Sequence, residues 1–246
     1  LACWGCNDPA DLTWIDPPPP APLAQARDLL AGLEAIDSGG RITPLGRDMA
    51  ALGLHPRLAH MVLRGRDLGL ERLACWIAAL LSERDPLRAG PGFRDADLAH
   101  RLDVLHGRAA PPGMDVDSGA VRRIQRVIQQ VERQLGRTRP SRAPATPHLA
   151  EGDAVGLLLA FAYPDRIGRA REGGGGRYAL SGGRGATFTE ATALARSEFI
   201  VVAALDAGDR EARIQLAASL DPALLETHFS ASIHEGASIA WDPKSE

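Results

Sequence analysis

Residues 40–59 read GRITPLGRDMAALGLHPRLA, a stretch that contains the starts of two helices. Thr43 is suited to cap a helix because its hydroxyl can accept a hydrogen bond from an unsatisfied backbone N–H, and Pro44 favours the first helical position. This helix should run through Leu52 and end at Gly53. The next helix should start near Pro56.

A further helix is expected before this stretch. Apolar side chains recur at helical spacing from Leu23 to Ile36, and the sequence Asp-Ser-Gly-Gly at 37–40 should end that helix. Residues 41–43 then form a short extended piece. A helix, a short strand and two helices within residues 23–69 are the outline of a small winged-helix domain.

The first 22 residues have a different character. Residues 1–22 contain the prolines 17–20 and 22, and we expect the tail of a preceding domain followed by a stiff linker. The sequence opens at Leu1 without a methionine, so we expect it to be part of a longer protein. Cys3 and Cys6 form a CxxC pair, but no second ligand pair follows at zinc-binding spacing. We therefore predict incidental thiols and no metal site.

Helical spacing continues in the middle of the chain. Amphipathic segments separated by Gly- and Pro-rich loops are found at 71–82, 95–106 and 117–136. A more apolar helix is expected from Ala154 to Tyr163. We predict a helical bundle over residues 70–172, with an exposed strap rich in Pro and Arg at 137–150.

The hydrophobic period changes to a strand-like pattern beyond Gly173. Two hairpins are predicted, with strands at 177–181 and 184–188 and at 199–205 and 212–218. A short helix should run from Asp221 to Phe229, and a last strand is expected at 233–241. Four or five short strands within residues 173–246 fit a small OB-like β-barrel. The predicted fold class is multidomain α+β: winged helix, helical bundle, then barrel.

Composition limits the chemistry that these residues can perform. Lys244 is the only lysine and is followed by Ser245 near the end of the chain, so the Gly-Lys-Ser/Thr phosphate loop of a nucleotide hydrolase is missing. The histidines show neither ligand spacing nor a nearby nucleophile motif. We therefore predict no catalytic residue and no cofactor site here. The longest apolar run, 154–162, is too short to span a bilayer, and no signal sequence opens the chain, so we expect a cytoplasmic protein.

One helix carries a directional charge pattern. At about 100° per residue, four arginines of the segment 117–136 and its end fall within ~60° of one another, opposite an apolar side. They are Arg122, Arg126, Arg133 and Arg137, which we call the α-ridge. Arg139 and Arg142 extend the positive charge, and Arg166, Arg169 and Arg171 form a second cluster. The net charge of −3 gives no general attraction to nucleic acid, so the α-ridge with Arg166 and Arg169 is the candidate contact surface. The alternative is a solvated helix face.

Several phrases also resemble a known family. They are the Trp-, Asp- and Pro-containing segment 4–18, GRITPLG at 40–46 with LHPRLA at 54–59, AALLSERD at 78–85, and YPDRI at 163–167. In this order they resemble the region that follows the two RecA-like ATPase domains of DEAH-box helicases, and the last phrase resembles the HrpB branch.

The resemblance implies an accessory region of an ATP-dependent RNA helicase. Its partners would be single-stranded RNA and the upstream RecA-like domains, and ATP and Mg would bind those domains rather than this region. The region alone would not be catalytic. Two alternatives remain open, a winged-helix DNA-binding regulator and a structural interaction module without nucleic-acid contact.

Overall fold

The computed structural model describes residues 1–6, 8–90, 95–138, 149–206 and 211–233. Its first long helices are α1 (Pro20–Gly32), α2 (Pro44–Ala51) and α3 (Pro56–Asp67). The predicted starts of α2 and α3 are confirmed. Thr43 Oγ1 accepts a hydrogen bond from Gly46 N at 2.9 Å, and Gly53 follows α2 with a left-handed φ of +62°.

Helix α1 differs from its prediction at both ends. It begins at Pro20 rather than Leu23, because proline is tolerated in the first helical turn. It ends at Gly32 rather than Ile36, and Glu34 then turns the chain with a φ of 56°. Ile36 instead pairs with Ile42 in an isolated antiparallel bridge, at the place where a short strand is expected. The apolar spacing continues past the true end of the helix, which is why spacing alone places the end too late.

Four helices form the bundle: α4 (Glu71–Ser82), α5 (Leu98–Leu105), α6 (Ser118–Leu135) and α7 (Glu151–Ala162). The bounds of α4 and α6 agree with the predicted segments. Helix α5 begins later than expected because Asp95 and Asp97 cap the turn that precedes it. Asp95 Oδ1 accepts from Asp97 N, and Asp97 Oδ1 accepts from Ala99 N, both at 2.9 Å.

A two-stranded sheet that the sequence does not predict lies beside α5. Strand β1 (Leu87–Ala89) pairs antiparallel with β2 (Met114–Val116). Both strands have three residues, too few for an alternating pattern to be recognised. The sheet closes the loop that carries α5.

The C-terminal part is a closed barrel of β3 (Ile167–Ala170), β4 (Arg177–Leu180), β5 (Gly185–Thr187), β6 (Phe199–Asp206) and β7 (Ala212–Ser219). The strand order is β3–β4–β5–β7–β6, with β6 pairing back to β3 and only β5 and β7 parallel among these described pairs. Both predicted hairpins are present, and the closed five-stranded barrel agrees with the OB-like type. Strand β3, however, begins before Gly173, where the sequence places the change of period.

Helix α8 (Pro222–Phe229) follows the barrel and is capped by Asp221, whose Oδ1 accepts from Ala223 N at 2.8 Å. The expected strand at 233–241 lies outside the described residues except for Ile233, as do the turn at 207–209 and most of the strap at 137–150. In the described part of the chain, no helix is both long enough and apolar enough to cross a membrane.

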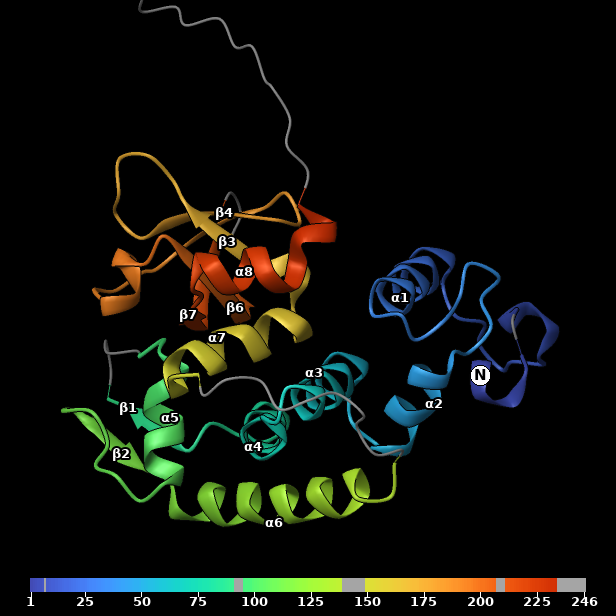
Figure 1. The fold of residues 1–246 in the computed structure, drawn as a ribbon, viewed down its shortest axis with the longest axis horizontal. Coiled ribbons are helices and arrows are strands. Elements are labelled where there is room, and N and C mark those ends of the chain that lie inside the picture. Colours follow the sequence, from blue (N-terminus) through green and yellow to red (C-terminus); the bar gives the residue numbers. More distant parts are fainter. Residues whose placement is uncertain (7, 91–94, 139–148, 207–210, 234–246) are drawn as a thin grey trace, which may run out of the picture.

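The elements are arranged in layers (Figure 1). Helix α6 lies along one edge, α3 and α4 form the next layer, and α7 separates them from the barrel, while α1 and α2 lie at one end. One buried core runs through these layers, from Leu33 of the winged helix to Ala218 of β7. A second core fills the barrel around Tyr178, whose hydroxyl donates to Leu194 O and Ser197 O at 2.9 Å. The domain boundaries at 22, 69 and 172 stay predictions, since the main core does not divide at them.

Contact between α7 and the barrel is unusually direct. A Cβ built on Gly156 would lie 2.0 Å from the backbone oxygen of Ser219. The backbones of α7 and β7 therefore touch without a side chain between them, and only glycine fits at this crossing. This contact fixes the barrel on the bundle.

Candidate nucleic-acid interface

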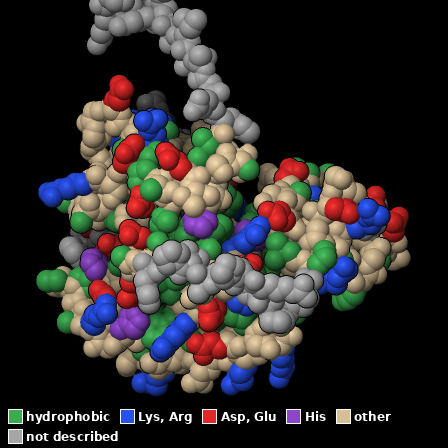
Figure 2. Space-filling model, in the orientation of Figure 1, with side chains coloured by type: hydrophobic (Ala, Val, Ile, Leu, Met, Phe, Trp, Pro, Cys, Tyr) green, Lys and Arg blue, Asp and Glu red, His purple; other side chains and the backbone are tan. Residues whose placement is uncertain are grey.

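The α-ridge lies on the outer side of α6. Arg122, Arg126, Arg133 and Arg137 are all exposed. On the opposite side of the helix, Ile124, Ile128, Val131 and Leu135 are buried against the bundle. Figure 2 shows Arg side chains along the edge of the molecule that α6 forms. The amphipathic geometry is thus as expected, whereas the role of the arginines stays a prediction.

The ridge arginines occur in two pairs. At a rise of ~1.5 Å per residue, Arg122 and Arg126 are separated by about 6 Å along the axis of α6. The second pair is Arg133, about 10 Å further along the helix, and Arg137, which follows the end of α6 at Leu135. Gln129 and Gln130 are exposed in the interval between these pairs. Within α6, Glu132 is the only acidic residue, and Arg123 instead faces Glu83 at 3.7 Å. The surface therefore offers mainly hydrogen-bond donors and positive charge, which suits a row of phosphates.

Arg166 and Arg169 lie far from this ridge. Arg166 directly precedes β3 and Arg169 lies within it, on the barrel, and α3, α4 and α7 lie between β3 and α6 (Figure 1). The structure therefore does not bring the six candidate arginines together. Arg139 and Arg142, which would extend the ridge, lie outside the described residues.

The two barrel arginines also differ from each other. Arg166 Nη1 donates to Ala203 O of β6 at 3.0 Å, and its guanidinium lies 5.0 Å from the ring centre of Tyr163. The Arg166 side chain is therefore engaged in packing. Arg169 is exposed, with its guanidinium 5.9 Å from the Phe199 ring centre, and remains accessible to a ligand.

Arg171, the third member of that cluster, belongs to an exposed ionic group on the barrel. Arg171 and Arg177 both contact Glu211, at 3.2 and 2.8 Å. Hydrogen bonding to Arg177 is the main cause that lowers the pKa of the Glu211 carboxyl. Between these arginines, residues 173–176 are four glycines with positive φ that connect β3 to β4. They are loop residues.

A junction at Arg57 was not foreseen from the sequence. Arg57, in the first turn of α3, forms two hydrogen bonds with Asp165, at 2.5 and 3.0 Å, and donates to Ala162 O at 3.0 Å. Its guanidinium lies 5.3 Å from the ring centre of Tyr163. Burial is the largest cause that lowers the pKa of the neighbouring His55, and the charges of Arg57 and Arg166 act in the same direction. The winged helix is thus tied to the segment that starts the barrel.

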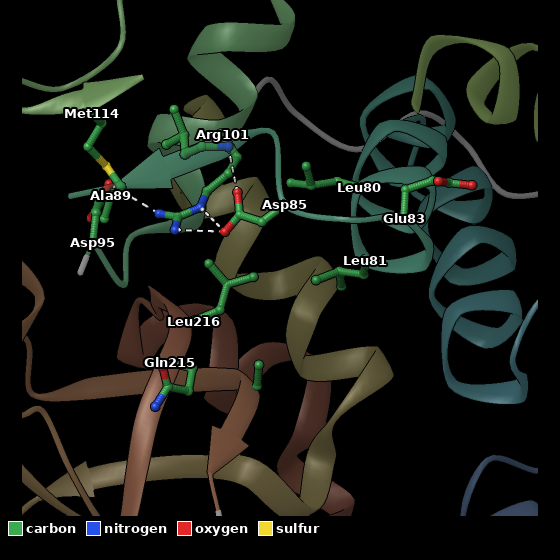
Figure 3. A pocket seen from close by; sticks show the side chains of 12 residues that line it. Leu80, Leu81, Glu83, Asp85, Ala89, Asp95, Arg101, Met114, Gln215 and Leu216 are labelled. Atoms are coloured by element: carbon green, nitrogen blue, oxygen red, sulfur yellow. Dashed lines mark hydrogen bonds and ion pairs between the residues drawn. The ribbon is translucent and has the colours of Figure 1, made fainter. Parts of the chain in front are cut away.

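A cleft of ≈ 380 Å3 opens where the bundle meets the barrel. Arg101 lies against it, with a side chain only 5% exposed. Figure 3 shows Arg101 joined to Asp85, with Leu81 and Leu216 across the open space. Arg101 also pairs with Asp95 at 3.1 Å and donates to Asp97 O at 2.9 Å, while burial raises the pKa of Asp97. These partners are structural, because they hold the capping turn of α5 in place.

The described cysteines have different surroundings. Cys3 is exposed, Cys6 Sγ contacts Asp8 O at 3.3 Å, and Cys75 is buried. Burial is the largest cause that raises the pKa of Cys75, to about 12. Over the ranges that the structure describes, no three His, Cys, Asp or Glu side chains are grouped so that they could hold a metal ion.

Comparisons with known proteins identify relatives that share this architecture. Residues 26–54 match the family described as "Helicase associated domain (HA2), winged-helix". Over 244 residues, 98% of the chain, the sequence is 33% identical to the ATP-dependent RNA helicase HrpB of Escherichia coli (strain K12). A crystal structure of E. coli DExH-box NTPase HrpB matches 94% of the chain with a TM-score of 0.69 and 31% identity. In both sequence and fold the chain matches the accessory region of an HrpB-type helicase.

This HrpB-type region is only part of the proteins it matches. It spans 26% of the E. coli HrpB sequence and 25% of the first matching structure. A second HrpB structure matches with a TM-score of 0.67, 31% identity, and coverage of 90% of the chain and 24% of that protein. The splicing helicase prp22 of Schizosaccharomyces pombe is 35% identical over 82 residues, 33% of this chain and 7% of that protein. The predicted fold class and helicase resemblance are confirmed.

Proposed function

We propose that this HrpB-type region engages single-stranded RNA for an ATP-dependent helicase whose motor binds ATP and Mg. We place this function in the cytoplasm. The observation that carries it is the α-ridge: three exposed arginines on one side of α6, whose other side is buried, and an exposed fourth just past its end. The similarity to RNA helicases supports RNA as the ligand, and the ridge supplies a local positive surface on a chain of net charge −3.

Exposed apolar side chains support a second contact, with the RecA-like domains. Of the described residues, the exposed large hydrophobics are concentrated near the start of the chain, at Leu1, Trp4, Leu12, Trp14 and Ile15. Trp4 is 85% exposed and Ile15 is 101% exposed. Such a concentration is typical of a protein–protein contact rather than of an ordinary solvated surface. We propose that these residues pack on the motor domains.

The barrel offers a second route for RNA. Arg169 is exposed there, and OB-fold barrels use their strands and loops to bind oligonucleotides. Because the ridge and the barrel lie on opposite sides of the bundle, a short oligonucleotide should engage one of them at a time. The α-ridge is proposed as the principal contact because its four arginines lie in a row and can contact successive phosphates of one strand.

Salt-dependent binding to a single-stranded RNA oligomer tests this function. Four phosphate contacts should give a log–log slope of affinity against salt of about −3, and each Arg→Ala change on the ridge should reduce the slope by about 0.7. A control with the same loss of charge replaces exposed arginines away from α6 and the barrel, Arg27, Arg41, Arg47 and Arg108. Both quadruple variants should keep the melting temperature.

Two results would count against the ridge. In one, the ridge variant binds with unchanged affinity and slope, which would move the RNA path to the barrel and Arg169. In the other, the control variant loses as much affinity as the ridge variant, which would mean that binding follows net charge only. A preference for duplex DNA over single-stranded RNA would instead favour the regulator alternative.

A further inference from the structure

An aromatic stack lies between α4 and the end of α5. Trp76 and His106 are stacked, with ring centres 4.6 Å apart and planes inclined by 27°. The guanidinium of Arg72, one turn earlier on α4, lies 5.6 Å from the ring centre of Trp76. Arg72 and His106 are exposed and Trp76 is half-buried. The stack therefore begins at the core and ends in solvent.

The orientation of the exposed ring is fixed in advance. His106 follows α5 as its C-cap residue, Trp76 supports the face of its ring, and Glu151 at the start of α7 lies 3.6 Å from its Nδ1. Three helices thus converge on one imidazole. A ring held in this way loses little conformational freedom when a flat ligand is stacked on it.

A cavity of ≈ 440 Å3 adjoins the stack. Trp76 and His106 line it together with apolar Leu70, Leu73 and Leu149, while Glu71, Arg72 and Glu151 supply charged groups. This volume lies within the range of small-ligand pockets, about 300–1,000 Å3. An aromatic wall, apolar sides and a few charged groups suit a flat ring that has apolar faces and polar edges, which describes a nucleobase.

We propose that the Trp76–His106 stack seats one unpaired base of a bound RNA strand, with Arg72 contacting a neighbouring phosphate. This inference rests on the proposed function and adds a base contact to it. We call this position of the base the seat. Helix α4 packs directly on α6, so the seat is in the layer next to the α-ridge. Stacking is available to every base, so the seat binds without strict sequence preference and favours purines, whose rings are larger.

Fluorescence of Trp76 tests the seat directly. Replacing Trp4, Trp14 and Trp241 with Phe leaves Trp76 as the single tryptophan. A titration with a twelve-nucleotide oligo(rA) should quench its emission to saturation. The matched control is an abasic oligomer of the same length, which has the phosphates without the bases and should bind more weakly with little quenching.

Substitutions separate stacking from charge. His106→Ala, at an exposed position, should weaken oligo(rA) binding by about fivefold or more and leave the abasic oligomer and the salt slope unchanged. Arg72→Ala should reduce the salt slope by about 0.7 for both oligomers. Unchanged melting temperatures confirm that neither variant acts through folding.

The outcomes distinguish this seat from the function on which it rests. If the ridge variant loses affinity while oligo(rA) leaves Trp76 emission unchanged, the seat is wrong and the proposed function stands. Equal losses of oligo(rA) and abasic binding in His106→Ala would also overturn the seat. If the unsubstituted chain binds neither oligomer, both proposals fail.

Discussion

Replacing Arg101 with methionine should destabilise the protein by about 3 kcal/mol. Methionine keeps much of the apolar stem, so the change isolates the guanidinium. That group donates to Asp97 O at 2.9 Å and Asp85 at 3.0 Å, and pairs with Asp95 at 3.1 Å. Breaking a buried pair by removing one partner typically costs about 3–5 kcal/mol, because the other charge stays buried.

The exposed fractions of the Asp95 and Asp85 side chains decide where in that range the loss of stability falls. The Asp95 side chain is 9% exposed and would keep only His100, at 2.6 Å, and the N–H of Asp97 as described partners. The Asp85 side chain is 46% exposed, so water can replace its lost partner. Because only Asp95 stays buried, and it keeps two partners, the expected cost is at the low end of that range.

Urea unfolding followed by circular dichroism and by tryptophan fluorescence measures this cost. Arg108→Met is the control, because Arg108 also pairs with an aspartate, Asp103, but the two side chains are 59% and 35% exposed. That variant should lose less than about 1 kcal/mol. Adding Asp95→Asn to Arg101→Met should recover part of the loss, since the buried charge is then removed. The reasoning is refuted if Arg101→Met costs no more than Arg108→Met.

Two further predictions concern helix packing and pH. Gly156→Ala should cost about 3 kcal/mol or more in urea unfolding, because its Cβ would lie 2.0 Å from Ser219 O, whereas Gly152→Ala in the same helix meets nothing within 4 Å and should be neutral or stabilising. Equal effects of the two changes would contradict the backbone contact. Burial is the largest cause that lowers the pKa of His60 below its ordinary value of 6.5, so the unfolded chain binds more protons there and stability should fall as pH decreases from about 6.5 towards the folded pKa. His60→Gln should make that fall shallower; an identical pH profile would show that His60 does not contribute.

The best-predicted features depend on residues close together in the sequence. Thr43 caps α2 through Gly46, and Asp117 caps α6 through the N–H groups of Gly119 and Ala120. Hairpin turns and the apolar side of α6 are equally local. A pattern of this kind is visible in a single window of sequence, so the elements and their approximate bounds follow from it.

The missed features depend on residues far apart. Arg57 and Asp165 are separated by 108 positions, and nothing in either segment identifies the other as its partner. Strand β3 contains Arg169, which its neighbours Arg166 and Arg171 mark as part of a basic cluster rather than of a strand. The exposure of the α-ridge was predictable from helical geometry. Its separation from Arg169 was not, because that distance is set by the stacking of α3, α4 and α7.

The crossing of α7 and β7 has a mechanical consequence. Because backbone touches backbone at Gly156, there is no layer of flexible side chains that could absorb a displacement. Helix α3 packs on α7, and Arg57 joins its first turn to Asp165. A displacement of the winged helix should therefore reach the barrel almost undiminished, as a rotation of one rigid body. Under the proposed function, any widening that admits an RNA strand would then occur at the outer surfaces of this body, rather than within it.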